Sequence, residues 1–256
     1  MTKKEKKEKK ENITFKEWLK DNVKALFWAL LIALSIRSCA LEPFNIPSSS
    51  MVPTLLVGDY LFVNKSAYGY SKYSFPLSMA PISDRIFYSE PQRGDIVVFR
   101  LPSKTSVDYI KRVIGLPGDK IQVKGGILHI NGTPVKRTFK KIVNEERGDK
   151  MFEHRLYDEE LPNGLVHEII EFSDNEKQDN TIEFNVPENH FFMMGDNRDN
   201  SKDSRWLDEV GYIPKSHLIG KAGFMFYSNN GYSPLLAFWN WNKSIRWNRL
   251  FKKIGP

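Results

Sequence analysis

Two short runs of this 256-residue chain contain residue types that could make and break an acyl bond. The first is a run of three consecutive serines that ends at Ser50 and is followed by Met51-Val52-Pro53-Thr54-Leu55. A serine hydroxyl becomes an effective nucleophile only when a neighbouring base removes its proton. A serine-rich turn is the simplest interpretation of the three serines alone, so the run needs a partner base before it predicts chemistry.

A lysine in the second run is a candidate for that base. Lys111 lies in a strand-like run, and alternation puts Tyr109, Lys111 and Val113 on one face. A lysine on an apolar face loses hydration, so its pKa falls toward the range in which a neutral amine accepts a proton. A solvated surface lysine is the common alternative. None of the five histidines stands in these runs, and Ser-Lys is a known variant of the nucleophile–base arrangement.

A third run, residues 195–205, is dense in polar side chains and directly follows the apolar residues 191–194. This position predicts a loop at the end of a strand. Its carboxylates could suggest calcium, but their spacing does not match an EF-hand loop, and Arg198, Lys202 and Arg205 oppose a bound cation. We therefore expect no metal, and we expect the run to position other groups through ion pairs and hydrogen bonds.

The elements that must position these runs are mostly short strands. After residue 43, apolar or alternating segments are separated by Gly, Pro, Asn and Asp, which predicts a mainly β fold with a sheet or barrel-like catalytic core. Residues 120–187 are polar, contain none of the chemistry above, and are expected to form an inserted smaller β subdomain. Residues 68–89 are typical of an extended hairpin or a mobile loop. The expected strands include residues 61–63, 96–99, 109–110, 113–114, 121–123, 127–130 and 191–194.

The N-terminal region predicts a membrane anchor. Residues 1–22 form an arm rich in lysine and glutamate, and the apolar residues 23–41 would reach about 28 Å as a helix, close to the thickness of a hydrocarbon core. A cleaved signal peptide would leave little chain ahead of Ser50, and a buried core helix would not explain the lysine arm. We expect one transmembrane helix with its N-terminus in the cytoplasm and the chain after residue 41 outside.

Composition limits the other classes of protein. Hydrophobic residues make up 41% and charged residues 27%, as in a globular protein and not a polytopic one. The net charge of +7 gathers at the two ends, which favours membrane lipid over nucleic acid as a partner. The single cysteine, Cys39, excludes an intramolecular disulfide. Residues 238–253 mix Trp with Lys and Arg, which predicts either an amphipathic segment on the membrane surface or a helix packed on the domain.

Taken in order, these runs resemble the motif set of the bacterial type I signal peptidases, also called leader peptidases. The match includes Glu42-Pro43-Phe44, the Ser50 run, residues 93–99, the Lys111 run and residues 195–205, so it covers the catalytic framework but not the inserted segment. The resemblance implies a serine endopeptidase of the bacterial cytoplasmic membrane that removes signal peptides from exported preproteins. It also implies small residues at P1 and P3, a catalytic domain on the periplasmic side and no cofactor.

The resemblance assigns roles to individual residues. Ser50 matches the nucleophile, and Lys111 matches the general base. Ser48 matches an oxyanion donor that acts with the backbone N–H of Ser50. Ser49 stands where many relatives have glycine. The remaining matches are Ser201, which orients the lysine; Asp203 and Arg205, a supporting salt bridge; Tyr109, a supporting residue beside the lysine; and Phe44, Ile46, Met51, Leu55 and Ile110, which line the pockets for P1 and P3.

The expected organisation is an arm at 1–22, an anchor at 23–41, a catalytic β domain at 42–119 and 188–256, and an inserted subdomain at 120–187. Two other functions stay open. A self-cleaving repressor also uses Ser-Lys chemistry, but it would need a DNA-binding helix-turn-helix where this N-terminus offers an apolar segment. A non-catalytic, membrane-tethered binding module is disfavoured because a nucleophile, a candidate base and an oxyanion donor are all present.

Overall fold

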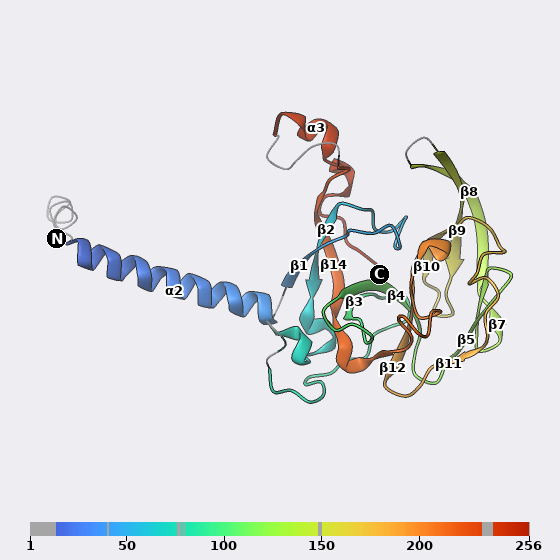
Figure 1. The fold of residues 1–256 in the computed structure, drawn as a ribbon, viewed down its shortest axis with the longest axis horizontal. Helices are drawn as coiled ribbons and strands as arrows, with labels where there is room; N and C mark the ends of the chain where they lie inside the picture. Colours follow the sequence, from blue (N-terminus) through green and yellow to red (C-terminus); the bar gives the residue numbers. More distant parts are fainter. Residues whose placement is uncertain are drawn as a thin grey trace.

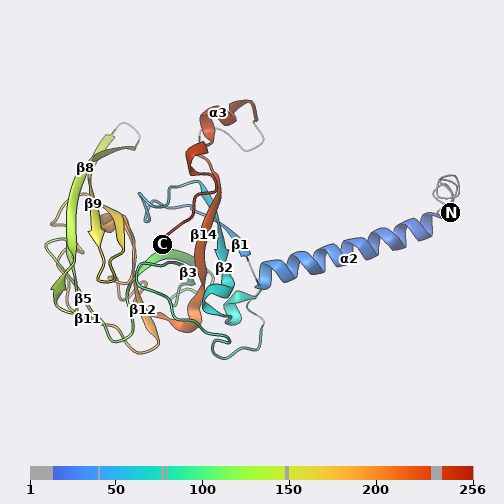
Figure 2. The ribbon, with the colours of Figure 1, turned by 180° about the vertical axis from the view of Figure 1, so that it is seen from behind.

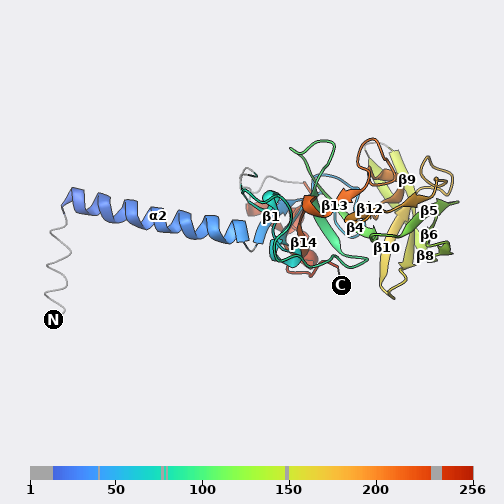
Figure 3. The same cartoon turned by 90° about the horizontal axis from the view of Figure 1, so that it is seen from below.

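The computed structural model describes residues 14–39, 41–75, 78, 80–147, 150–231 and 238–255. Within these ranges the chain is mainly β, as predicted, with three antiparallel sheets and one long helix. The helix α2 (Phe15–Cys39) extends away from the body that the sheets form (Figure 1). The sheets built from residues 120–187 lie on the opposite side of the body from α2, with the seven-stranded sheet between them (Figure 3).

The helix α2 begins earlier than the sequence analysis predicted. Thr14 and Glu17 form a reciprocal cap, in which Glu17 N donates to Thr14 Oγ1 at 3.4 Å and Thr14 N donates to Glu17 Oε2 at 3.1 Å. Residues 15–22, expected in the charged arm, are therefore helical, and residues 1–13 of that arm lie outside the described ranges.

The predicted transmembrane helix is not supported by the described residues. Among them, no helix is both long enough and apolar enough to cross a membrane. The N-terminal half of α2 carries five charged residues, Lys16, Glu17, Lys20, Asp21 and Lys24.

The largest sheet has seven strands in the order β1-β2-β14-β3-β4-β12-β13, and every neighbouring pair is antiparallel. β14 lies between β2 and β3 (Figure 2), so the last long strand of the chain joins two early ones. In the described residues β1 and β13 are free edges, so the sheet is open and not a closed barrel. The strands are β1 (Leu41–Asn45), β2 (Asp59–Asn64), β3 (Ile96–Arg100), β4 (Asp108–Gly115), β12 (His190–Met194), β13 (Ile213–Pro214) and β14 (Leu218–Ser228).

The segment 120–187 forms two smaller sheets, in the orders β11-β5-β6-β7 and β10-β9-β8. It shares a hydrophobic core with the large sheet, because Ile121, Leu128 and Phe184 pack in one cluster with Ile114 and Phe192. The domain boundaries therefore stay a prediction. The strands are β5 (Lys120–Lys124), β6 (Ile127–Ile130), β7 (Thr133–Pro134), β8 (Lys136–Arg147), β9 (Lys150–Glu160), β10 (Val166–Glu171) and β11 (Phe184–Asn185).

The buried Arg85 joins the region 68–89 to the large sheet through hydrogen bonds. Arg85 donates to the carbonyl oxygens of Tyr68 at 2.8 Å and of Leu218, the first residue of β14, at 2.6 Å. Tyr70 and Ile86 form an antiparallel bridge. The described part of this region therefore fits the hairpin alternative better than the mobile loop.

Backbone hydrogen bonds and an ion pair hold the C-terminal region against the body, while several of its aromatic side chains are exposed. Phe251 N donates to Met225 O at 2.7 Å, and Arg249 forms an ion pair with the buried Asp59. Phe238, Trp239, Trp247 and Phe251 are exposed. The region contains only one short α-helix in its described part. The short helices are α3 (Trp241–Ser244) and the 3₁₀ turns η1 (Lys65–Tyr68), η2 (Lys72–Ser74), η4 (Arg198–Asn200), η5 (Lys215–His217), η6 (Phe238–Asn240) and η7 (Trp247–Arg249).

Candidate active site

Ser50 lies in the loop between β1 and β2. Two backbone hydrogen bonds close this loop, from Ile46 N to Asp59 O at 2.8 Å and from Gly58 N to Ile46 O at 2.9 Å. Ser49 is not among the residues with a left-handed backbone, so a serine fits this position without backbone strain. The loop therefore presents Ser50 on a fixed backbone at the end of the edge strand.

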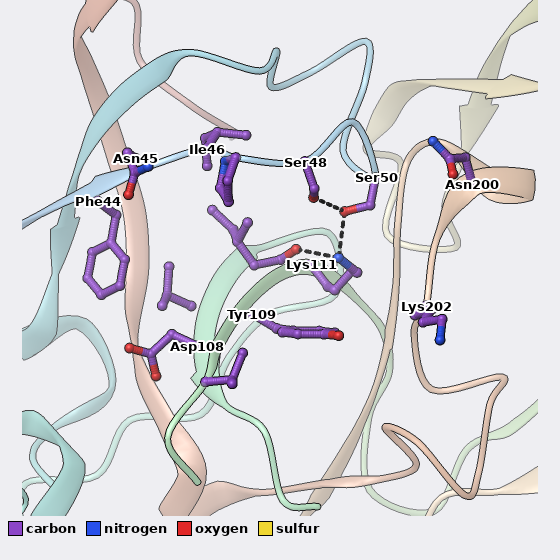
Figure 4. Close-up of a pocket in the computed structure, with 14 residues that line it drawn as sticks. Phe44, Asn45, Ile46, Ser48, Ser50, Asp108, Tyr109, Lys111, Asn200 and Lys202 are labelled. Atoms are coloured by element: carbon purple, nitrogen blue, oxygen red, sulfur yellow. Dashed lines mark hydrogen bonds between the residues drawn. The ribbon is translucent and has the colours of Figure 1, made fainter. Parts of the chain in front are cut away.

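Lys111 of β4 reaches the Ser50 hydroxyl from across the sheet. Its Nζ lies 2.7 Å from Ser50 Oγ and donates to Ile110 O at 3.0 Å (Figure 4). Only 4% of Lys111 and 8% of Ser50 are exposed. The two side chains that the sequence analysis named as nucleophile and base are thus in direct contact and shielded from water.

Burial dominates the electrostatics of Lys111 and lowers its pKa from its ordinary value to about 8. The carboxylates of Asp203 and Asp196 oppose this change, and Arg205 adds to it. An amine with a pKa near 8 is neutral in about one molecule in ten at pH 7, far more often than an ordinary lysine, and only the neutral form can accept a proton.

Ser48 also points toward Ser50. Its Oγ lies 3.2 Å from Ser50 Oγ, on the side of the site that Phe44 and Ile46 line (Figure 4). A hydroxyl here can donate to an oxygen that develops negative charge next to Ser50. The position fits the predicted oxyanion donor, whose role stays a prediction.

The run 195–205 forms a loop at the end of β12, as predicted. Four of its charged residues are buried, namely Asp196, Arg198, Asp203 and Arg205, while Lys202 is exposed. Arg205 holds Asp203 through two hydrogen bonds of 2.9 Å, and Gly195 N donates to Asp203 Oδ2 at 3.0 Å. Arg205 also donates to Arg198 O at 2.5 Å. The predicted salt bridge between Asp203 and Arg205 is therefore present, and it ties the two ends of the loop together.

Ser201 and Tyr109 both lie beside the dyad. The ring centroid of Tyr109 is 5.1 Å from Lys111 Nζ. Ser201 is buried against Gly195, where a Cβ would come within 2.3 Å of Ser201 Oγ. The hydrogen bonds of Lys111 Nζ go to Ser50 Oγ and Ile110 O and not to Ser201, so the role of Ser201 in orienting the lysine stays a prediction.

A cavity of about 460 Å³ opens beside Ser50 and Lys111. Phe44, Ile46 and Ile110 line it, as predicted for substrate-binding residues. Met51 and Leu55 do not line it, because they are fully buried in the hydrophobic cluster behind its wall. The sequence analysis missed several lining residues on both sides of the dyad, namely Asn45, Pro47, Val98, Val107, Asp108, Asn200 and Lys202.

The sequence analysis also missed the buried pair of Arg112 and Asp196. Arg112 Nε donates to Asp196 Oδ1 at 2.8 Å and Nη2 donates to Oδ2 at 2.7 Å. Thr54 Oγ1 donates to the same carboxylate at 2.5 Å. Although burial opposes it, Arg112 keeps the pKa of Asp196 below its ordinary value. Side chains alternate along a strand, so Arg112 points to the opposite face of β4 from Lys111. This alternation was the sequence signal that could have predicted a buried role for Arg112.

Comparison with known proteins places this arrangement in a family. The family model described as "Signal peptidase, peptidase S26" matches residues 17–227. The chain belongs to this family. The S26 match begins inside α2 and ends in β14, so it includes Ser50, Lys111 and the loop 195–205.

Curated members of the S26 signal peptidases match nearly the whole chain. Signal peptidase I of Rickettsia typhi is 37% identical over 267 residues, covering 96% of this chain and 97% of the relative. Signal peptidase I of Rickettsia akari is 40% identical, covering 89% and 90%. A solved structure of a signal peptidase I from Enterococcus faecalis is 25% identical, covers 52% of this chain and 97% of that chain, and has a TM-score of 0.30.

Proposed function

We propose that this chain is a serine endopeptidase with a Ser50–Lys111 dyad that removes signal peptides from exported preproteins. One observation carries the proposal: Lys111 Nζ lies 2.7 Å from Ser50 Oγ at a buried site beside an apolar cavity. Membership of the family and similarity to proteins named Signal peptidase I support the substrate class. No cofactor, metal or nucleic acid enters the proposal.

The dyad supports acyl transfer in two steps. Neutral Lys111 takes the proton of Ser50 as its oxygen attacks the scissile carbonyl carbon. Ser48 Oγ and the backbone N–H of Ser50 then donate to the oxyanion. As the C–N bond breaks, the lysine ammonium gives its proton to the leaving amine, and an ester on Ser50 remains. A water that Lys111 deprotonates hydrolyses this ester and restores the free hydroxyl.

The cavity supports a preference for small residues before the scissile bond. Phe44, Ile46 and Ile110 provide apolar walls, and β1 is an edge strand of the sheet. An extended peptide can add beside an edge strand and project alternate side chains, those of P1 and P3, toward the same wall.

We extend the proposal to attachment at the bacterial cytoplasmic membrane, as a single pass with the N-terminus in the cytoplasm and the catalytic part outside. The apolar side chains of α2, such as Phe27, Leu30 and Ile32, are exposed, and so are Trp239 and Trp247 of the C-terminal region. Lipid contact would cover these groups, and the basic arm is typical of the cytoplasmic end.

The deciding experiment measures cleavage of a detergent-solubilised preprotein with an Ala-x-Ala site. Wild type is compared with Ser50→Ala and Lys111→Ala, each of which should lose at least about 1,000-fold in kcat. Lys120→Ala is the matched control, because this lysine is exposed and paired with Glu183 at 3.5 Å. Cleavage by Lys111→Ala at the wild-type rate would mean that the base lies elsewhere.

The membrane proposal has its own test. The full chain should stay in the membrane pellet after an alkaline wash, and a chain starting at residue 42 should not. Protease added outside spheroplasts should digest a C-terminal tag. A tag that resists this protease would overturn the proposed orientation.

A further inference from the structure

Two residues of the segment 120–187 enter a buried charge network next to the active-site loop. Glu159 of β9 forms two hydrogen bonds with Arg198, from Nη1 to Oε1 at 3.0 Å and from Nη2 to Oε2 at 2.5 Å. Only 1% of Glu159 and 2% of Arg198 are exposed. Although burial opposes it, Arg198 and His167 hold the pKa of Glu159 well below its ordinary range, so the pair is ionised.

His167 of β10 lies between the two buried carboxylates of this region. Its Nε2 is 3.3 Å from Glu159 Oε2, and its Nδ1 is 3.7 Å from Asp196 Oδ1. The backbone of β10 also contacts this region, because Ile170 N donates to Asp196 O at 2.9 Å. Side chains and backbone of the inserted strands β9 and β10 therefore both contact residues 196–198.

Those residues contact the dyad in turn. Asn197 N donates to Ser50 O at 3.1 Å, and Arg198 O accepts from Arg205, which holds Asp203. Asp203 and Asp196 both act on the pKa of Lys111. A displacement of residues 196–198 would thus move the backbone of the nucleophile and the charges around the base.

We propose that Glu159 is a positioning residue, through which the inserted sheet β10-β9-β8 holds the loop 195–205 in register with Ser50 and Lys111. This inference rests on the proposed function, because its test measures kcat for the cleavage of a signal peptide. A salt bridge on the protein surface could not do this, because a solvated pair holds its partners weakly. A buried bidentate pair fixes both distance and orientation, and loss of one partner leaves an uncompensated charge.

The test compares Glu159→Gln with Glu160→Gln. Glu160 is the matched control, because it neighbours Glu159 on β9 but pairs with Lys136 at the exposed surface. We expect Glu159→Gln to lower kcat by about 10- to 100-fold with little change in KM, since a misplacement of 1 Å costs about 100-fold. Glu160→Gln should keep both constants.

Hydrogen–deuterium exchange separates positioning from general stability. Glu159→Gln should lose protection at residues 195–200 and keep it in β3 and β4. Loss of protection throughout the chain, or unchanged kcat and exchange, would overturn the proposal. Should the wild type cleave no signal peptide, the proposed function fails, while the exchange measurement still decides whether Glu159 holds the loop.

A second variant keeps the proposal testable if Glu159→Gln does not fold. Glu159→Gln combined with Arg198→Met removes both charges, so no uncompensated charge is buried. If the network positions the loop, this double variant folds but keeps the low kcat. Recovery of wild-type kcat in the double variant would show that the buried charge alone caused the defect, and would overturn the proposal.

Discussion

The backbone N–H of Asn197 donates to the carbonyl oxygen of Ser50 at 3.1 Å. This bond joins the loop between β1 and β2 to the loop after β12, although the two residues are far apart in the sequence. Ser50 is therefore held from both sides, by its own loop between β1 and β2 and by the loop that carries Asp203.

The pH dependence of cleavage should follow Lys111. Because burial lowers the pKa of this amine to about 8, kcat/KM should rise about tenfold per pH unit below pH 8 and level off above it. The measurement is a pH profile of kcat/KM with one peptide substrate. A profile that is flat between pH 6 and 9 would contradict Lys111 as the base.

Replacing the lysine should cost activity and increase stability. In the unfolded chain Lys111 holds its proton up to about pH 10.5, while the folded chain releases it near pH 8. The unfolded state thus binds more protons between these values, so the free energy of unfolding rises with pH there and is lowest below pH 8. Lys111→Met should raise the free energy of unfolding at pH 7 by about 1–3 kcal/mol.

Urea unfolding at pH 7 and pH 10.5 checks this prediction. The gain of Lys111→Met should shrink at the higher pH, because both forms then bury a neutral group. Lys120→Met, at an exposed position, should show no such gain at either pH. A Lys111→Met variant less stable than wild type at pH 7 would argue against a depressed pKa.

Gly195 packs closely against both Ser201 and Ser50, so we expect that no side chain can be accommodated at this position. A Cβ there would lie 2.3 Å from Ser201 Oγ and 2.5 Å from Ser50 O, distances that real contacts do not reach. Gly195→Ala should lower kcat by about 100-fold, because the nucleophile must shift by a sizeable fraction of an ångström. Gly223→Ala, where a Cβ would meet Phe62 O at 3.1 Å, is the milder comparison. Equal kcat in the two variants would count against the described packing.

The wall of the cavity should control which substrates are accepted. Phe44→Ala enlarges the apolar cavity, so kcat/KM for a peptide with Leu at P1 or P3 should rise about tenfold relative to Ala. Leu55→Ala serves as the control, because Leu55 is fully buried behind the wall. That variant should lower the melting temperature and leave the Leu-to-Ala ratio unchanged.

Features that depend on neighbouring residues could be predicted from the sequence. The strands at 61–63, 96–99, 121–123, 127–130 and 191–194 are confirmed, because alternation and turn residues are local signals. The early start of α2 had a local signal too, the Thr14–Glu17 capping box, which the interpretation of 1–22 as a charged arm overlooked.

Features that depend on tertiary contacts could not be predicted. Met51 and Leu55 follow the serine run closely, but only the packed core shows that they lie behind the cavity and do not face it. Likewise, Glu159 is an ordinary charged residue in a charged strand until β9 brings it to Arg198. The fold decides which charged residues, tens of positions apart in the chain, come together as a pair. A single sequence carries no signal for this pairing.

The place of β14 between β2 and β3 has a consequence for how the enzyme matures. During synthesis the loop with Ser50 and the strand with Lys111 emerge early, but the sheet that holds them together lacks its middle until residues 218–228 have been made. Non-local pairing of this kind forms late, because the intervening chain must be closed first. A ribosome-bound chain would thus carry Ser50 and Lys111 long before the sheet could bring the two side chains together.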